Sequence, residues 1–265
     1  MIASLPMYGV DPAAVERFWG VLAAKLAERG LADVPAQLAW PDDLAAHWRA
    51  PDLLISQACG YPLVQGLSHH VRVVGAFCYA AEGCTGSDYR SRLVTRKDLA
   101  LDGIADFRGR TVAFNSRDSQ SGYNGLRALV APLQTDGRFF GATVETGAHR
   151  RSIEAVLGGA ADIAAIDCVT LALIARSEPE IVAGLKDVGA TAPAPGLPVI
   201  TSATTSDADL ERLRQAIEDT VADPALAAIS EALLIAGFER LDLADYARCT
   251  AMRDFAIERG YPELA

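Results

Sequence analysis

The chain has 265 residues, of which 51% are hydrophobic and 22% are charged. This composition is typical of a globular protein with a large core and excludes a disordered or fibrous chain. There are 24 lysines and arginines against 34 aspartates and glutamates, which gives a formal net charge of −10. That balance argues against a nucleic-acid partner or an anionic membrane surface, because both need clustered basic residues. A small anionic ligand stays possible, because the local field of a pocket can oppose the global charge.

No run of eighteen or more apolar residues occurs, so no membrane insertion is expected. The N-terminus lacks the basic and long apolar regions of a signal peptide. We therefore expect a cytoplasmic protein as the sequence stands, or a periplasmic one if this is a processed chain with an added methionine. At roughly 150 residues per domain, the length allows two compact lobes or one large α/β domain.

The first elements alternate strands with helices. Residues 1–8 are expected to form a short buried strand. Asp11 and Pro12 then open a helix, as an N-cap followed by proline at the first helical position, and Gly30 ends it. Further strands are expected at residues 35–40, 52–56 and 71–77, with a brief helix from residue 42 or 43 to residue 48. This order predicts a parallel sheet covered by helices.

An extended segment at residues 90–95 is expected to leave this first lobe. The second lobe should alternate strands with helices, at residues 111–115, 122–130, 142–146, 152–157, 162–166 and 169–175. The proline-rich residues 192–198 predict a stiff crossing back. Helices are then expected at residues 207–222, 224–236 and 243–259.

Two crossings would make the first lobe discontinuous. We expect residues 1–93 and 197–265 to form lobe 1, and residues 94–196 to form lobe 2. Ligands of such hinged α/β proteins bind in the cleft at the carboxyl ends of the strands.

The most informative segment is residues 115–124, between a predicted strand and a predicted helix. A helix start presents backbone N–H groups without acceptors and the positive end of the helix dipole. Ser119 and Ser121 add hydroxyl donors, and Gly122 allows close approach to the backbone. Together these features predict an anion site that needs no lysine or arginine. The alternative is ordinary helix capping by serine.

Other polar and aromatic residues also follow predicted strands. His149 can donate to an anion, or be a cap or surface residue. Asp167 can be an N-cap for the next helix, or an acceptor that faces the cleft. Tyr8 and Tyr61 can form walls of the cleft, or belong to the core.

Five cysteines are present, and none forms a CxxC pair; they are Cys59, Cys78, Cys84, Cys168 and Cys249. The expectation is buried or partly exposed thiols in a reducing compartment, with a disulfide or a metal site as the alternative.

The order of Tyr8, residues 59–62, residues 118–124, His149 and residues 159–167 resembles the phosphate/phosphite/phosphonate-binding proteins of ABC importers. The resemblance covers nearly the whole chain. It implies the type II periplasmic-binding-protein fold, an α/β fold of two lobes, each a mainly parallel sheet flanked by helices, with a hinge of two crossings. It also implies a non-enzymatic solute-binding protein, which closes over a small oxyanion in the interlobe cleft and delivers it to an ABC permease. We further expect a monomer without cofactors.

By position, the resemblance implies that Ser119, Gln120 and Ser121 hold ligand oxygens, that His149 donates a further hydrogen bond, and that Asp167 accepts one from a protonated ligand oxygen. Phosphate, phosphite and many phosphonates carry such a proton near neutral pH, whereas sulfate does not. The carboxylate would therefore select against sulfate by repulsion. The two tyrosines of the first lobe, Tyr8 and Tyr61, would close the cleft.

Two further functions are compatible with the sequence. The first is a metal-ion site, because mixed oxygen, nitrogen and sulfur ligands suit iron, zinc or copper. Its candidate ligands are Cys59, Tyr61, His149, Asp167 and Cys168. The second is an enzyme on a binding-protein fold, with Cys59 or Cys168 as nucleophile and His149 as base.

Overall fold

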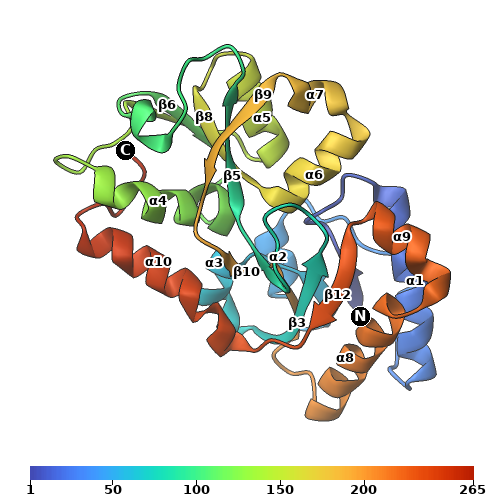
Figure 1. Ribbon diagram of the computed structural model, residues 1–265. Helices are drawn as coiled ribbons and strands as arrows, with labels where there is room; N and C mark the ends of the chain where they lie inside the picture. Colours follow the sequence, from blue (N-terminus) through green and yellow to red (C-terminus); the bar gives the residue numbers. More distant parts are fainter. The chain divides into compact units, whose positions relative to one another are not determined.

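Two units make up the computed structural model, which describes residues 1–265 (Figure 1). None of the helices has the length and apolar character that a membrane span requires. Unit 1 consists of Met1–Ala80, Cys84–Asp88 and Pro195–Tyr246, and unit 2 consists of Ala81–Gly83, Tyr89–Ala194 and Ala247–Ala265.

Unit 1 is built on a five-stranded sheet with the order β1-β2-β11-β3-β12. Its strands are β1 (Ile2–Ser4), β2 (Leu53–Gln57), β3 (Val71–Tyr79), β11 (Pro198–Ser202) and β12 (Ile235–Glu239). β1 and β2 are parallel, but β11 runs antiparallel to both β2 and β3, and β12 runs antiparallel to β3. The sheet is therefore mixed, which corrects the expectation of a mainly parallel one. β4 (Asp88–Tyr89) and β10 (Ala194–Pro195) form a separate two-stranded sheet.

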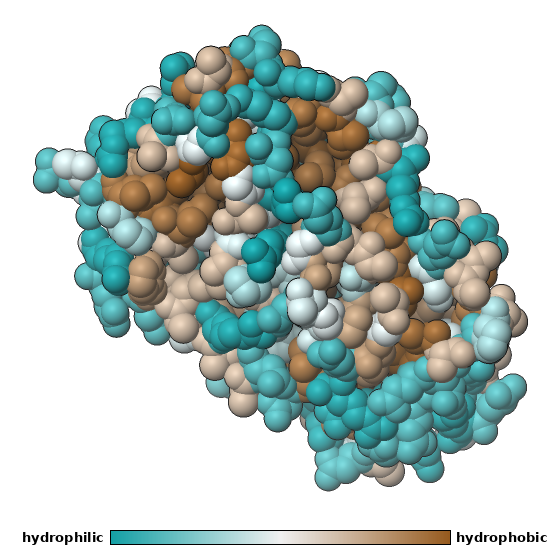
Figure 2. All heavy atoms as spheres, viewed as in Figure 1, coloured by the Kyte–Doolittle hydropathy of each residue, from teal (hydrophilic) through white to brown (hydrophobic).

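The helices of unit 1 bury apolar stripes against this sheet. They are α1 (Pro12–Glu28), α2 (Leu44–Trp48), α3 (Gly60–Val64), α8 (Asp207–Val221) and α9 (Ala227–Ala232), with short 3₁₀ turns at Leu67–His69, Pro224–Leu226 and Leu243–Tyr246. α1 begins as expected, since Asp11 Oδ1 accepts from Ala14 N at 2.9 Å. Its residues Phe18, Trp19 and Leu22 are at most 1% exposed, and burial of each such side chain stabilises the fold by about 1.5–3 kcal/mol. The outer face of α8 is hydrophilic (Figure 2).

Unit 2 is built on a second five-stranded sheet, with the order β7-β6-β8-β5-β9. Its strands are β5 (Ser91–Arg96), β6 (Thr111–Phe114), β7 (Ala142–Glu145), β8 (Ile163–Asp167) and β9 (Leu185–Ala190). β6, β7 and β8 are parallel, while β5 is antiparallel to β8 and β9. This sheet is also mixed.

Helices pack on both faces of the second sheet. They are η3 (Gln120–Asn124), which is a π-helical turn, α4 (Gly125–Val130), α5 (His149–Leu157), α6 (Cys168–Ser177), α7 (Pro179–Ala183) and α10 (Ala247–Glu258), with 3₁₀ turns at Ile104–Phe107 and Ala131–Leu133. Leu93 of β5 joins the core under α4, and the next residue, Val94, joins the core under α5. Successive side chains of a strand point to opposite faces, so β5 is buried on both.

The unit boundaries differ from the expected lobes in two places. The chain first enters unit 2 at Ala81–Gly83, returns to unit 1 for Cys84–Asp88, and continues in unit 2 from Tyr89, before residue 93. The last nineteen residues, 247–265, belong to unit 2, although lobe 1 was expected to include them. The reason is that α10 and the segment after it supply Ala256, Tyr261 and Leu264 to the unit 2 core.

Several predicted elements are also corrected. Residues 35–40 form no strand. One backbone hydrogen bond, from Ala39 N to Ala3 O (2.7 Å), connects them to β1. The helix expected at residues 224–236 ends at Ala232, and the chain continues as β12. α7, β9 and β11 were not predicted. β9 buries only Val188, so its sequence has no apolar alternation. β11 begins at Pro198, the last residue of the proline-rich segment for which a stiff crossing was expected.

Candidate functional site

Polar residues gather at one edge of the unit 2 sheet. Asp167 is the last residue of β8, and Asn115 directly follows β6. Ser91, the first residue of the antiparallel strand β5, pairs with Asp167. The carboxyl ends of β6 and β8 and the amino end of β5 therefore lie at the same edge.

The serine segment enters its helix through a capped π turn. Ser119 Oγ accepts from Gly122 N at 3.0 Å, and Asn124 N donates to Ser119 O at 2.9 Å, a bond between residues five apart. A helix start leaves its first N–H groups without acceptors in the helix, and π turns often mark functional sites. The expected capping by serine is thus present at Ser119, while Ser121 has different partners.

Buried hydrogen bonds anchor this turn to α10. Asn124 Nδ2 donates to Gln120 Oε1 (2.8 Å) and to Cys249 O (2.9 Å), and Arg127 Nη2 donates to Asn124 Oδ1 (2.8 Å). Gln120 Nε2 lies 3.1 Å from Met252 Sδ. The amide of Gln120 therefore faces the interior of unit 2.

The hydroxyl of Ser121 lies beside His149. Ser121 Oγ is 2.8 Å from His149 Nε2 and 3.4 Å from Ser119 Oγ, and Ser121 O accepts from Ser91 Oγ at 2.9 Å. His149 Nδ1 is buried and has no hydrogen-bond partner in the protein. Burial lowers the pKa of His149 to about 4, so the imidazole is neutral at pH 7.

A neutral imidazole carries one proton, and its position decides what Ser121 can offer. With the proton on Nε2, His149 donates to Ser121 Oγ, and the serine hydroxyl is left to donate elsewhere. With the proton on Nδ1, Nε2 accepts the serine proton instead. An anionic ligand favours the first arrangement, because it can accept the proton of Ser121.

Asp167 caps α6, as one of its two sequence-based interpretations predicts. Its Oδ1 accepts from Val169 N (2.8 Å) and Thr170 N (3.0 Å), and its side chain is nearly fully buried. Its second expected role, acceptance of a proton from the ligand, stays a prediction.

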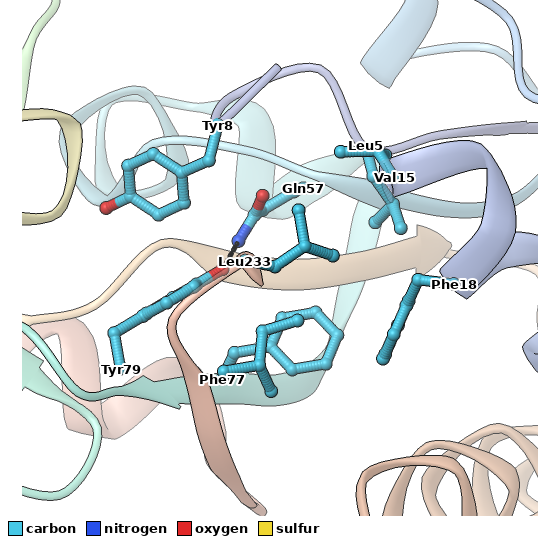
Figure 3. Close-up of a pocket in the computed structure, with 9 residues that line it drawn as sticks. Leu5, Tyr8, Val15, Phe18, Gln57, Phe77, Tyr79 and Leu233 are labelled. Atoms are coloured by element: carbon cyan, nitrogen blue, oxygen red, sulfur yellow. Dashed lines mark hydrogen bonds between the residues drawn. The ribbon is translucent and has the colours of Figure 1, made fainter. Parts of the chain in front are cut away.

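The two tyrosines named from the sequence belong to unit 1 and have different surroundings. Tyr8 follows β1 and lines a pocket of this unit (Figure 3). Its ring packs edge to face against Tyr79, with the two ring centroids 4.9 Å apart. Gln57 Nε2 donates to the Tyr79 hydroxyl at 3.0 Å. Tyr61 is buried in the first turn of α3 and does not line this pocket.

This pocket encloses about 340 Å³ of empty space, part of it open to solvent. Figure 3 shows Tyr8 and Tyr79 on one side and Val15 and Phe18 of α1 on the other. Its lining is Leu5, Tyr8, Val15, Phe18, Gln57, Phe77, Tyr79, Leu233 and Ile235. Such a lining suits an apolar group with one polar atom directed to Gln57 or Tyr79. Neither Gln57 nor Tyr79 was predicted from the sequence, although each is the polar last residue of an apolar strand.

The cysteines agree with the expectation of buried or partly exposed thiols. Cys59, Cys168 and Cys249 are buried, and Cys78 and Cys84 are partly exposed. Burial, followed by the nearby Glu239, raises the pKa of Cys78 to about 11. No group of three or more histidine, cysteine, aspartate or glutamate side chains is placed to hold a metal ion.

Two α/β units, each with a mixed five-stranded sheet, together form the fold of periplasmic-type solute-binding proteins, as the resemblance implies. Residues 5–246 match the family described as ABC transporter, phosphonate, periplasmic substrate-binding protein, and the chain belongs to this family. The family consists of substrate-binding proteins, not enzymes. No curated protein is similar enough in sequence to count as a relative.

Solved structures with the same fold include two phosphonate-binding proteins. The binding-protein component PA3383 of an ABC phosphonate transporter from Pseudomonas aeruginosa aligns with a TM-score of 0.78 and 19% identity, over 97% of this chain and 87% of its own. PhnD1 from Prochlorococcus marinus, in complex with methylphosphonate, aligns with a TM-score of 0.76 and 14% identity, over 96% of both chains. XAC2383 from Xanthomonas citri, bound to ATP, aligns with a TM-score of 0.70 and 14% identity, over 98% of this chain and 97% of its own.

Proposed function

We propose that the chain binds a phosphonate- or phosphate-like oxyanion at the serine segment of unit 2. The Ser121 hydroxyl and the backbone N–H groups at the start of η3 would donate to ligand oxygens. The observation that carries this proposal is the 2.8 Å contact of Ser121 Oγ with His149 Nε2, because an imidazole with its proton on Nε2 donates to Ser121 and leaves the serine proton for the ligand. The family's phosphonate-binding proteins support the same ligand class.

The second residue in this proposal is Asp167, which would accept a hydrogen bond from a protonated ligand oxygen. Gln120 would contribute its backbone, because its amide is bonded within unit 2. Tyr8 and Tyr61 stay predicted ligand contacts, and the variants Tyr8→Phe and Tyr61→Phe test them by calorimetry. We also propose that the ligand passes to an ABC permease, which the family description supports.

Isothermal titration calorimetry with methylphosphonate, phosphite, phosphate and sulfate tests the oxyanion proposal. We expect binding of at least one phosphorus oxyanion and weaker binding of sulfate. Loss of a hydrogen bond to a charged group costs about 1.5–3 kcal/mol, so Ser121→Ala should weaken binding about tenfold to a hundredfold.

Ser177→Ala is the matched control, because Ser177 is a unit 2 serine whose hydroxyl bonds to Leu173 O at the far end of α6. It should leave the affinity unchanged. Absence of binding by all four anions in a folded protein would overturn the proposal, as would equal affinities of the Ser121→Ala variant and the unmodified chain.

A further inference from the structure

Arg90, which directly precedes β5, forms no ion pair with an acidic side chain of the protein. Its Nε atom is buried without a hydrogen-bond partner, and its guanidinium takes part in none of the ion pairs of the chain. The next arginines of β5 are different: Arg92 pairs with Glu82 and Asp187, and Arg96 pairs with Asp98. A buried donor without an acceptor is costly, which distinguishes Arg90 from exposed arginines such as Arg110, whose guanidinium water can solvate.

The position of Arg90 places it at the edge of the sheet that holds the serine segment. Its carbonyl accepts from Cys168 N at 3.1 Å, next to the end of β8. The following residue, Ser91, pairs with Asp167 and donates to Ser121 O. Arg90 is thus one residue from the side chain that fixes the serine segment to β5.

The stem of Arg90 is held by tight packing. A Cβ built on Gly83 would lie 3.1 Å from Arg90 Cγ and 3.2 Å from Cys168 Cβ, so all three residues are in close contact. Gly83 also has a positive φ of 108°, which other residues rarely adopt. A side chain fixed in this way loses little entropy when its guanidinium binds a ligand.

Two more buried polar atoms at this edge have no partner in the protein, Asn115 Oδ1 and His149 Nδ1. A Cβ built on Gly122 would overlap Asn115 Oδ1 and lie 3.3 Å from His149 Cε1, so both side chains border the serine segment. Most buried polar atoms in proteins are hydrogen-bonded. Both of these atoms are acceptors when the imidazole proton is on Nε2, so a donor such as the protonated oxygen of the first oxyanion would complete their bonding.

We propose that Arg90 forms a subsite for a second acidic group of the ligand, a carboxylate or a second phosphorus oxyanion. The inference rests on the proposed function, since the first oxyanion would occupy the serine segment. A guanidinium presents donors in a planar fork that fits two oxygens of one acidic group. The ligand class is therefore a phosphonate or phosphate with two acidic groups, in place of one with an alkyl or amino substituent.

Calorimetry on the full chain with four probes tests this subsite. Methylphosphonate has one acidic group, phosphonoacetate adds a carboxylate, methylenediphosphonate adds a second phosphonate, and 2-aminoethylphosphonate adds a cation. We expect phosphonoacetate or methylenediphosphonate to bind at least tenfold more tightly than methylphosphonate, and 2-aminoethylphosphonate to bind more weakly. The better of the two acidic probes identifies the second group.

Arg90→Gln should remove this tenfold advantage and change methylphosphonate affinity less than about twofold. Arg110→Gln is the control, because Arg110 is exposed and precedes β6 at the opposite edge of the sheet. The Arg110→Gln variant should still bind the better acidic probe at least tenfold more tightly than methylphosphonate.

An unmodified chain that binds methylphosphonate as tightly as both acidic probes would overturn the subsite and leave the oxyanion proposal standing. An Arg90→Gln variant that keeps the full advantage would do the same. If none of the probes binds, the proposed function itself fails. The comparison of probes on the unmodified chain decides the question even if Arg90→Gln does not fold.

Discussion

Ser121 Oγ and His149 Nε2 lie 2.8 Å apart, and they connect the first turn of one helical segment with the first residue of α5. The sequence predicted both residues as direct ligand contacts. The geometry gives His149 a second possible task, which is to set the direction of the Ser121 hydroxyl. Both tasks need a proton on the nitrogen that donates, and at pH 7 the neutral imidazole carries one proton for its two nitrogens.

Two substitutions of His149 distinguish the effect of losing its hydrogen-bond donor from the effect of changing its side-chain volume. We expect His149→Leu to weaken methylphosphonate binding by about tenfold, the loss of one hydrogen bond of about 1.5 kcal/mol, because a leucine cannot donate to Ser121. His149→Gln retains an N–H donor and should recover much of the affinity. Calorimetry measures both, and circular dichroism confirms the fold. Equal affinities for the two variants would contradict a donor role.

The stability of the chain should depend on pH through His149. Its pKa is about 4 in the folded state and 6.5 in an unfolded reference, so between pH 6.5 and 4 the unfolded chain binds the proton more strongly than the folded chain. The free energy of unfolding should therefore fall as the pH decreases from 6.5 to 4, by up to about 3 kcal/mol from this residue. Above pH 6.5 this contribution is constant.

Urea unfolding at pH 7, 5.5 and 4.5 measures this dependence. The unmodified chain should lose more stability than His149→Gln over the same interval, because both chains share all carboxylates. Parallel pH profiles of the two proteins would show that His149 does not titrate in this way.

The Asp167→Asn variant tests whether the negative charge of the Asp167 carboxylate selects against sulfate, and it should change the structure little. Asparagine is an equally good N-cap, so α6 should keep the bonds that Asp167 Oδ1 accepts from Val169 N and Thr170 N. Removal of the carboxylate should raise sulfate affinity, because repulsion of a fully ionised oxyanion is lost. Phosphate affinity should fall less than sulfate affinity rises. Calorimetry with both anions decides the point, and undetectable sulfate binding by the variant would exclude Asp167 as the discriminating residue.

Gly122 should tolerate no side chain. A Cβ at this position would overlap Asn115 Oδ1, so Gly122→Ala has to displace Asn115 or the serine segment. We expect a loss of about 1–3 kcal/mol in stability, together with weaker oxyanion binding. Gly103→Ala is the control, since nothing lies within 4 Å of a Cβ there. Thermal unfolding and calorimetry compare the two, and equal stability of both variants would contradict the overlap.

Local signals in the sequence predicted much of this molecule. Asp11 with Pro12 set the start of α1, and the serine segment was placed correctly between β6 and a helix. The π turn was not predicted, and its contacts include a bond from Asn124 Nδ2 to Cys249 O, 125 residues later in the chain, which no local pattern indicates. Residues 247–265 were expected in the other lobe for a similar reason. Their packing against unit 2 joins distant parts of the chain, and local sequence signals do not show such contacts.

Side-chain partners were the least predictable part of the site. Gln120 was named as a ligand residue from its position in the motif, but its amide bonds to Asn124 and lies against Met252. Arg90 carried no motif and was passed over, since an unpaired charge is visible only when every neighbour is placed. Tyr79 and Gln57 were missed for a related reason, because their pairing joins the ends of two separate strands.

The insertion of β11 between β2 and β3 has a consequence for how the protein is made. More than a hundred residues separate the end of β3 at Tyr79 from the start of β11 at Pro198. At about 5–20 residues per second, a ribosome needs several seconds to supply the missing strand. During that time the facing edges of β2 and β3 have no partner, and exposed strand edges of this kind are where nascent chains aggregate or recruit chaperones.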